Sequence, residues 1–269
     1  MIKLNKGPKP AVLVANQTTW SSDLQALITQ YGSYKDIPKK EKTSAINHYK
    51  NDEILNALKQ DPGGKKCVYC ETLLEVSSFS NIEHYHPKSL YPLEIFEWGN
   101  MFMGCTMCNS NKNNFDTVNK PFIHPLNEDP ERYLTFDELR LVPRESDPNK
   151  LDYQKAYNVI EACKLKYRNA LIRKHADLLH SFLNYIEKLE EELIHYNSLT
   201  QNAAKRKSAI NILESLNILK SEASVDSEYA GYTRYLLRKF DEIRQSVAIV
   251  NLYPNDLVPD TGFDWGFVY

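Results

Sequence analysis

The sequence predicts a mainly α-helical protein with one small zinc-stapled ββα unit, an α+β fold overall. Apolar residues recur at helical spacing over most of the stretch that follows Leu151. Two Cys-x-x-C pairs, Cys67/Cys70 and Cys105/Cys108, indicate a metal site. The stretch that contains these pairs is poor in apolar residues, so we expect a bound metal ion to stabilise it.

Residues 1–60 are predicted to form an N-terminal helical docking segment. Residues 6–10 read K-G-P-K-P, which favours extended or turn backbone. Residues 21–23 read S-S-D and predict the cap of a short helix, and a second helix is expected over Thr43–Lys59. The run D-P-G-G at residues 61–64 interrupts the helical pattern and predicts a domain boundary.

Residues 61–148 are predicted to form the zinc-stabilised module. Short strands are expected over Ser78–His86 and Trp98–Met103, with a helix beginning near Thr106 or Met107. A stretch rich in Pro, Asp and Asn follows, and a short hairpin is expected across residues 137–138. The run D-P-N at residues 147–149 predicts the second boundary.

Residues 149–269 are predicted to form a C-terminal helical domain. One long helix is expected over residues 152–196, and two more over residues 201–220 and 228–250. In the second of these, the residues expected to face the core are Ile210, Leu213, Leu216 and Leu219. The last residues are irregular and unusually aromatic.

Composition limits the possible partners and compartment. The formal net charge is −2, and residues 61–125 hold five Lys and no Arg against seven Asp and Glu. A protein that binds nucleic acid unaided usually has a basic face, so any phosphate contacts of this chain must come from other segments or from a partner protein. No apolar run reaches the roughly 18 residues that a membrane span requires, and the first residues lack the apolar core of a signal peptide. These features predict a cytoplasmic protein without a membrane partner.

The two cysteine pairs predict a structural zinc ion. A two-residue spacer lets both thiolates of a pair reach one tetrahedral ion, and 34 residues separate Cys70 from Cys105. Four unligated thiols and a redox Cys-x-x-C remain alternatives, although neither pair lies in a thioredoxin-like pattern. The fifth cysteine, Cys163, is expected to be a small buried apolar residue.

Residues between and after the cysteine pairs carry the groups that phosphodiester hydrolysis requires. His84 is the candidate general base that activates water. Glu83 and Asn109 offer the oxygen ligands that Mg²⁺ or Mn²⁺ prefers, and Asn100 is a candidate to orient the His84 ring. Taken singly, Asn100 is also typical of a turn, and Asn109 of a helix cap.

The order Glu-His, then Asn, then Asn-x-x-Lys after the second cysteine pair resembles the HNH (ββα-metal) endonuclease family with two zinc-binding Cys-x-x-C pairs. The resemblance implies that Glu83 and Asn109 bind the catalytic ion, that His84 is the base and that Asn100 positions it. It also implies that Lys112 is the basic residue of the following helix, at the nucleic acid. His86 stands where relatives often carry another basic residue, and it either contacts phosphate or has no role.

The wider chain is similar to a narrower group, the HNH subunit (PtuB) of the Septu anti-phage system. The similarity lies in residues 1–13, in the run E-H-Y-H-P-K and in the helical C-terminal half. It implies a nuclease effector that cuts nucleic acid, with DNA as the expected substrate and RNA left open, and that works with an ATPase partner subunit (PtuA-like). The alternative is a non-catalytic zinc-finger adaptor that binds nucleic acid or protein.

Overall fold

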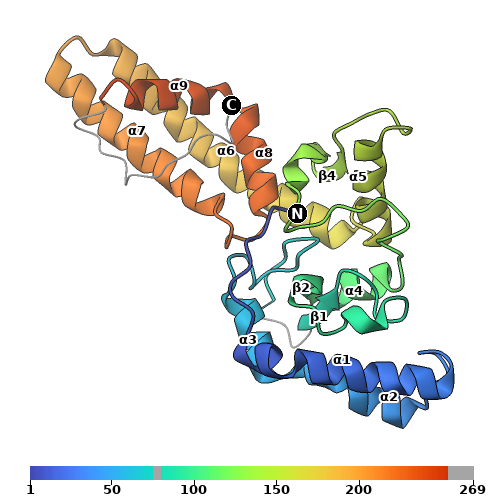
Figure 1. Cartoon of the computed structure of the whole chain (residues 1–269). Helices are drawn as coiled ribbons and strands as arrows, with labels where there is room; N and C mark the ends of the chain where they lie inside the picture. Colours follow the sequence, from blue (N-terminus) through green and yellow to red (C-terminus); the bar gives the residue numbers. More distant parts are fainter. Residues whose placement is uncertain (75–79, 254–269) are drawn as a thin grey trace. The chain divides into compact units, whose positions relative to one another are not determined.

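The chain forms two compact units, Met1–Arg168 and Asn169–Tyr269, and the computed structural model describes residues 1–74 and 80–253 (Figure 1). Helices predominate, and the named strands of the described residues form two short antiparallel hairpins. This composition confirms the predicted mainly α, α+β class. The aromatic end predicted to be irregular, residues 254–269, lies outside the described residues. No helix in the described part of the chain is both long enough and apolar enough to cross a bilayer.

The N-terminal segment contains three α-helices and one short 3₁₀ turn. These elements are α1 (Ala11–Tyr31), α2 (Lys39–Ile46), η1 (Asn47–Lys50) and α3 (Asp52–Gln60). Helix α1 begins directly after Pro10 and ends at Gly32, whose φ of 80° suits a residue without a side chain. The prediction that a helix begins at residues 21–23 is therefore wrong, because these residues lie inside α1, which begins directly after Pro10. The predicted helix over Thr43–Lys59 is interrupted at Asn51, whose side chain accepts a hydrogen bond from the Glu53 amide and caps α3.

A ββα unit follows, as the sequence predicts. Strand β1 (Ser80–His84) pairs antiparallel with β2 (Met101–Cys105), so that Glu83 lies opposite Phe102. The 3₁₀ turns η2 (Pro92–Glu94) and η3 (Trp98–Asn100) lie in the connection between the strands. Helix α4 (Thr106–Lys112) begins directly after β2 and packs on both strands. The predicted first strand ends at His84 instead of His86, and the predicted start at Ser78 lies outside the described residues.

The rest of the first unit packs as a second hairpin and a helix. After the turn η4 (Pro130–Arg132), strands β3 (Leu134–Asp137) and β4 (Arg140–Pro143) pair across residues 138–139. This confirms the predicted hairpin. Helix α5 (Leu151–Ala162) packs against β4.

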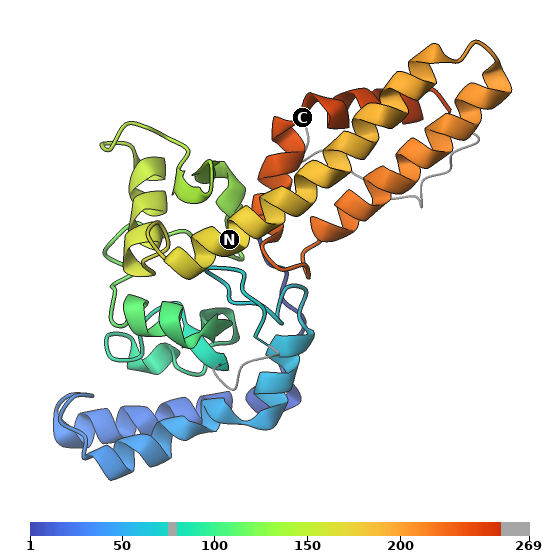
Figure 2. The ribbon, with the colours of Figure 1, turned by 180° about the vertical axis from the view of Figure 1, so that it is seen from behind.

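The second unit is a helical bundle. Its helices are α6 (Asn169–Ser198), α7 (Asn202–Glu222), α8 (Ala230–Lys239) and α9 (Asp241–Val250). Helices α6 and α7 lie side by side, and α9 contacts both (Figures 1 and 2). Two predicted helices are each divided in the structure. Lys164, with a φ of 52°, lies between α5 and α6, and Phe240 has extended backbone between α8 and α9.

The buried face of α7 differs from the predicted one. Ile212 is fully buried, whereas Ile210, predicted to face the core, is 37% exposed. Leu216 and Leu219 are buried as predicted. Two stripes of apolar residues have helical spacing on this helix, and the contacts of α7 with α6 and α9 decide which stripe is covered.

These two isoleucines provide a matched test of the bundle core. Ile212→Ala removes fully buried methyl groups and is expected to lower the free energy of unfolding by about 2–5 kcal/mol. Ile210→Ala, on the same helix, is expected to lower it by less than ~1 kcal/mol. Urea denaturation followed by circular dichroism measures both values, and equal losses would contradict the packing described here.

Candidate metal centre and active-site pocket

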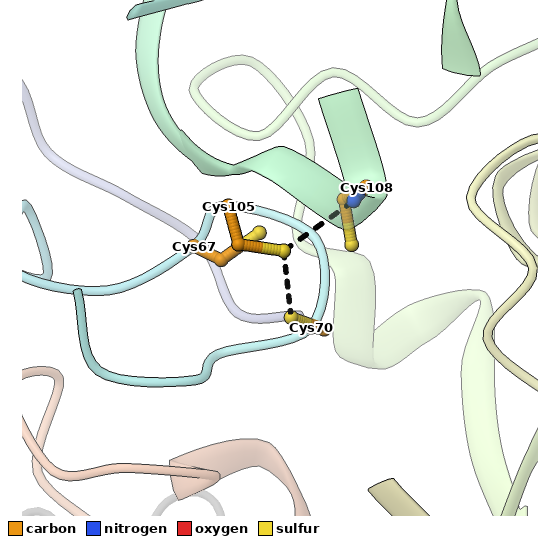
Figure 3. A group of neighbouring side chains, drawn as sticks. All are labelled: Cys67, Cys70, Cys105 and Cys108. Carbon is orange, nitrogen blue, oxygen red and sulfur yellow. Dashed lines mark hydrogen bonds between the residues drawn. The ribbon is translucent and has the colours of Figure 1, made fainter. Parts of the chain in front are cut away.

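Four cysteine side chains converge at one point of the first unit. Cys67 and Cys70 lie in a loop before β1, whereas Cys105 ends β2 and Cys108 lies in the first turn of α4 (Figure 3). The Val68 amide donates a hydrogen bond of 2.9 Å to the Met103 carbonyl, which fixes the loop to β2. The metal centre thus connects two segments that are far apart in the sequence.

The sulfur positions fit a tetrahedral metal ion. All four Sγ atoms lie within 4.8 Å of one another, and the Cys70 and Cys105 sulfurs are 3.8 Å apart. A tetrahedral zinc site with Zn–S bonds of about 2.3 Å requires sulfur separations of about 3.8 Å. Cys67 and Cys108 are almost fully buried, and the Cys108 amide donates to Cys105 Sγ. The residues therefore fit the zinc ion that the sequence predicts.

A half-buried arginine lies beside this cluster. Arg168 donates from Nη1 to Cys108 Sγ at 3.3 Å and from Nη2 to the Cys163 carbonyl at 2.5 Å. Burial opposes the charge of the guanidinium, but the negative thiolates, Cys108 foremost, outweigh burial and raise the pKa of Arg168. Hydrogen bonds from the other thiols, first from Cys108, hold the pKa of Cys105 far below its ordinary value. Cys163 itself is fully buried, as predicted.

Glu83 is a buried carboxylate held by two partners. Its Oε1 atom accepts a hydrogen bond from the Tyr69 hydroxyl at 3.1 Å and lies 2.7 Å from Lys112 Nζ. Burial raises the pKa of Glu83, and the charge of Lys112 counteracts that rise. Gly104 on β2 leaves the necessary space, because a Cβ atom there would lie 3.0 Å from the Glu83 Cβ.

Lys112 is an internal residue of the ββα unit. Its side chain is only 1% exposed, and its Nζ donates a 2.9 Å hydrogen bond to the His84 carbonyl in addition to its ion pair with Glu83. The sequence predicts a nucleic-acid contact for Lys112. The structure instead directs its charge toward the backbone and the carboxylate of β1.

The His84 ring is buried, and one of its nitrogens has no hydrogen-bond partner in the part of the chain that the structure describes. Nε2 lies 2.9 Å from the Ile95 carbonyl, so Nε2 carries the proton and donates it to this bond. Nδ1 is buried and lacks a hydrogen-bond partner among the described residues. The edge of the Tyr49 ring packs against the imidazole with a centroid distance of 4.9 Å. Burial, followed by the charge of Lys88, lowers the pKa of His84 to about 3.

Asn100 acts on the backbone around His84 instead of on its ring. Its Oδ1 atom accepts from the His86 amide at 2.6 Å, and its Nδ2 atom donates to the Glu94 carbonyl at 3.0 Å. The next carbonyl, that of Ile95, holds the His84 ring. Asn100 therefore does not contact the His84 ring directly, and its orienting role stays a prediction.

Glu83, His84 and Asn109 line one pocket of about 360 Å³ in the first unit. Three residues that the sequence did not single out complete this arrangement: Lys88 and Tyr34 in the lining, and Tyr49 behind His84. Lys88 lies close after His84 in the run E-H-Y-H-P-K, which was a signal available in the sequence. Tyr34 and Tyr49 come from the N-terminal segment, and no sequence pattern indicated a role for either of them in this pocket.

His86, the other candidate for contact with nucleic acid, is engaged elsewhere. Its Nδ1 atom pairs with the Glu94 carboxylate, and its ring lies 5.4 Å from that of Tyr91. The side chain is 28% exposed. Its role in phosphate contact stays a prediction.

Metal content tests the cysteine cluster. The purified protein is expected to hold about one zinc ion per chain, because four thiolates complete one tetrahedral site. Cys108→Ser is expected to lose most of this metal, whereas Cys163→Ala, which changes the buried cysteine outside the cluster, is expected to keep it. Elemental analysis after gel filtration measures the ratio, and equal retention by both variants would contradict the assigned ligands.

The guanidinium next to the thiolates is expected to strengthen metal binding. Arg168→Gln removes the charge that partly balances the cluster, and groups that contact metal ligands typically contribute 10–100-fold in affinity. We expect a loss of about that size, measured by competition with a chromophoric chelator. Arg173→Gln, an exposed arginine of α6, is the control and should keep the parental affinity. Equal affinities of the two variants would contradict the role of Arg168.

Comparisons with known proteins agree with the predicted resemblance. No protein-family model matches the chain. Septu protein PtuB from Bacillus thuringiensis is 28% identical over 166 residues, which cover 61% of each chain. Septu protein PtuB from Bacillus mycoides (strain KBAB4) is 27% identical over 172 residues, which cover 53% of this chain and 57% of the relative. The matches thus span about three fifths of the length of these relatives, and they confirm that the chain resembles Septu PtuB.

Proposed function

We propose that this protein is a metal-dependent HNH endonuclease that hydrolyses phosphodiester bonds of nucleic acid. The observation that carries the proposal is the pocket in which Glu83, His84 and Asn109 meet, with His84 Nδ1 buried and without a hydrogen-bond partner among the described residues. A buried polar atom without a partner is rare in native proteins, and at a pocket it is typical of a functional group. The adaptor alternative requires only the four cysteines and leaves this atom unexplained.

His84 is the general base of this proposal. The bond from Nε2 to the Ile95 carbonyl sets the tautomer, so the lone pair is on Nδ1. The low pKa keeps the ring neutral at pH 7, and the lone pair is therefore available to accept a proton from water. Asn100 and Lys112 support this geometry by holding the backbone that carries the Ile95 and His84 carbonyls.

Glu83 and Asn109 are the residues that would hold a catalytic Mg²⁺ or Mn²⁺ ion. Carboxylate and amide oxygens are the ligands that these hard ions prefer. When bound, such an ion stabilises negative charge on the phosphate and on the departing oxygen. Tyr69 and Lys112 both contact Oε1 of Glu83, which fixes the carboxylate group in place. Zinc held by the four cysteines has a structural role.

We infer that the chain acts in anti-phage defence, because both relatives carry the name Septu protein PtuB. The resemblance to Septu PtuB implies an ATPase partner subunit, and DNA is the expected substrate. The charge of residues 61–125 supports the need for a partner, since seven acidic residues outnumber five lysines there. Such a module gains little of the non-specific affinity that basic surfaces supply.

Loss of the general base tests the activity directly. His84→Ala is expected to reduce plasmid cleavage in Mg²⁺ or Mn²⁺ by about 10²–10⁴-fold. His180→Ala changes an exposed histidine of α6 and should cleave like the parent. Both variants are expected to keep zinc, which shows that the ββα unit is intact. The assay is run with the chain alone and with its copurified partner.

Two results would contradict the proposal. Cleavage by His84→Ala at the parental rate would remove His84 from the mechanism. An absence of cleavage under all of these conditions, with zinc and nucleic-acid binding intact, would favour the adaptor alternative.

A further inference from the structure

The pocket that holds His84 also contains an ammonium group that forms no ion pair with any described residue. Of the described residues that line it, Lys88 is the one with a cationic side chain. The ion pairs of the described residues do not include Lys88, and its hydrogen-bond partner is the neutral hydroxyl of Tyr49 at 2.8 Å. In the described part of the chain, its positive charge is therefore not balanced by a directly bound anion. Lys112, in contrast, is buried against Glu83.

Tyr49 contacts both the ammonium group of Lys88 and the imidazole ring of the candidate base, His84. The Lys88 Nζ atom lies 4.3 Å from the centroid of the Tyr49 ring, whose edge packs against the His84 imidazole at 4.9 Å. Tyr49 is only 7% exposed and lies in η1, within the N-terminal segment. A cation over an aromatic face is held by the ring quadrupole, so the tyrosine limits the positions that Lys88 can take.

The remaining hydrogens of Lys88 are suited to an anion. An ammonium has three donors, and the Tyr49 hydroxyl takes one of them. Phosphate oxygens accept charge-assisted hydrogen bonds of this kind, and lysine binds them as a compact point charge. Glu83, the one carboxylate among the described lining residues, is paired with Lys112, and the charge of Lys88 acts on it through space without a direct ion pair. The neighbouring lining residues Ser89, Asn109 and Asn114 are polar and uncharged.

We propose that Lys88 binds a phosphate group of the nucleic acid in this pocket and that Tyr49, from the N-terminal segment, positions its ammonium. The inference rests on the proposed function for the identity of the ligand. It adds a substrate-binding residue to which the sequence analysis assigned no role. It also makes the N-terminal segment part of the site.

Salt dependence of binding provides the test. Affinity for a short fluorescein-labelled DNA duplex is measured by anisotropy at several salt concentrations. The full-length zinc-loaded protein is used without added Mg²⁺ or Mn²⁺, and a denaturing gel checks that the probe stays intact. Each phosphate contact contributes about 0.9 to the slope of log affinity against log salt. Lys88→Met is expected to bind several-fold more weakly and to lose about 0.9 of this slope.

Three further variants separate a phosphate contact from a structural effect. Lys88→Arg keeps the charge and should keep the slope. Tyr49→Phe removes the hydroxyl but keeps the ring, and it should weaken binding by less than Lys88→Met does. Lys50→Met is the matched control, because Lys50 is exposed, lies 5.8 Å from the same ring and does not line the pocket. Its slope should equal that of the parent.

A parental slope and affinity in Lys88→Met, or a slope loss of the same size in Lys50→Met, would overturn the inference. Cleavage of the same duplex in Mg²⁺ is measured separately. Loss of slope in Lys88→Met from a parent that never cleaves would support the phosphate contact and count against the nuclease. If the parent cleaves the duplex but Lys88→Met keeps the parental salt slope, the nuclease is supported and the phosphate contact of Lys88 is contradicted.

Discussion

The four-cysteine cluster is the constraint on which the first unit depends. It connects the loop at residues 67–70 to the junction between β2 and α4, and that junction sets where Asn109 and Lys112 emerge. The ββα unit has two strands of five residues and a helix of seven, which is too little for a stable core in isolation. Structural zinc contributes about 10–16 kcal/mol of binding free energy to small folds of this kind. A metal ion held by the four cysteines would supplement the small apolar core of this unit.

A buried polar network connects the cysteine cluster to the pocket. Lys112 on α4 contacts both Glu83 and the His84 carbonyl on β1, while Tyr69 reaches Glu83 from the first cysteine loop. Buried ion pairs are weak contributors to stability, because desolvation offsets most of the attraction. Removing one partner alone lowers the free energy of unfolding strongly, because it leaves an unpaired buried charge. The network is thus better explained by the precise placement of Glu83 and His84 than by stability.

The N-terminal segment also contacts the residues that surround the pocket. Lys6 donates hydrogen bonds to the Trp98 and Met101 carbonyls, and its Nζ lies 4.1 Å from the Trp98 ring centroid. Burial lowers the pKa of Lys6 to about 7. These contacts bracket Asn100, whose amide in turn holds the loop behind His84. The segment predicted to dock partners therefore also supports the backbone of the pocket.

The sequence by itself determined the elements whose signals are local. Cysteine spacing predicted the metal centre, the order of Glu83, His84 and Asn109 predicted the residues that share a pocket, and turn residues predicted the β3–β4 hairpin. Tertiary structure alone decided the remaining features. Helical periodicity does not distinguish the buried stripe of α7 from the exposed one, and it continues through the breaks at Lys164 and Phe240. The burial of Lys112, the free nitrogen of His84 and the contacts of Tyr49 and Lys88 arise between residues distant in the sequence, which no local pattern encodes.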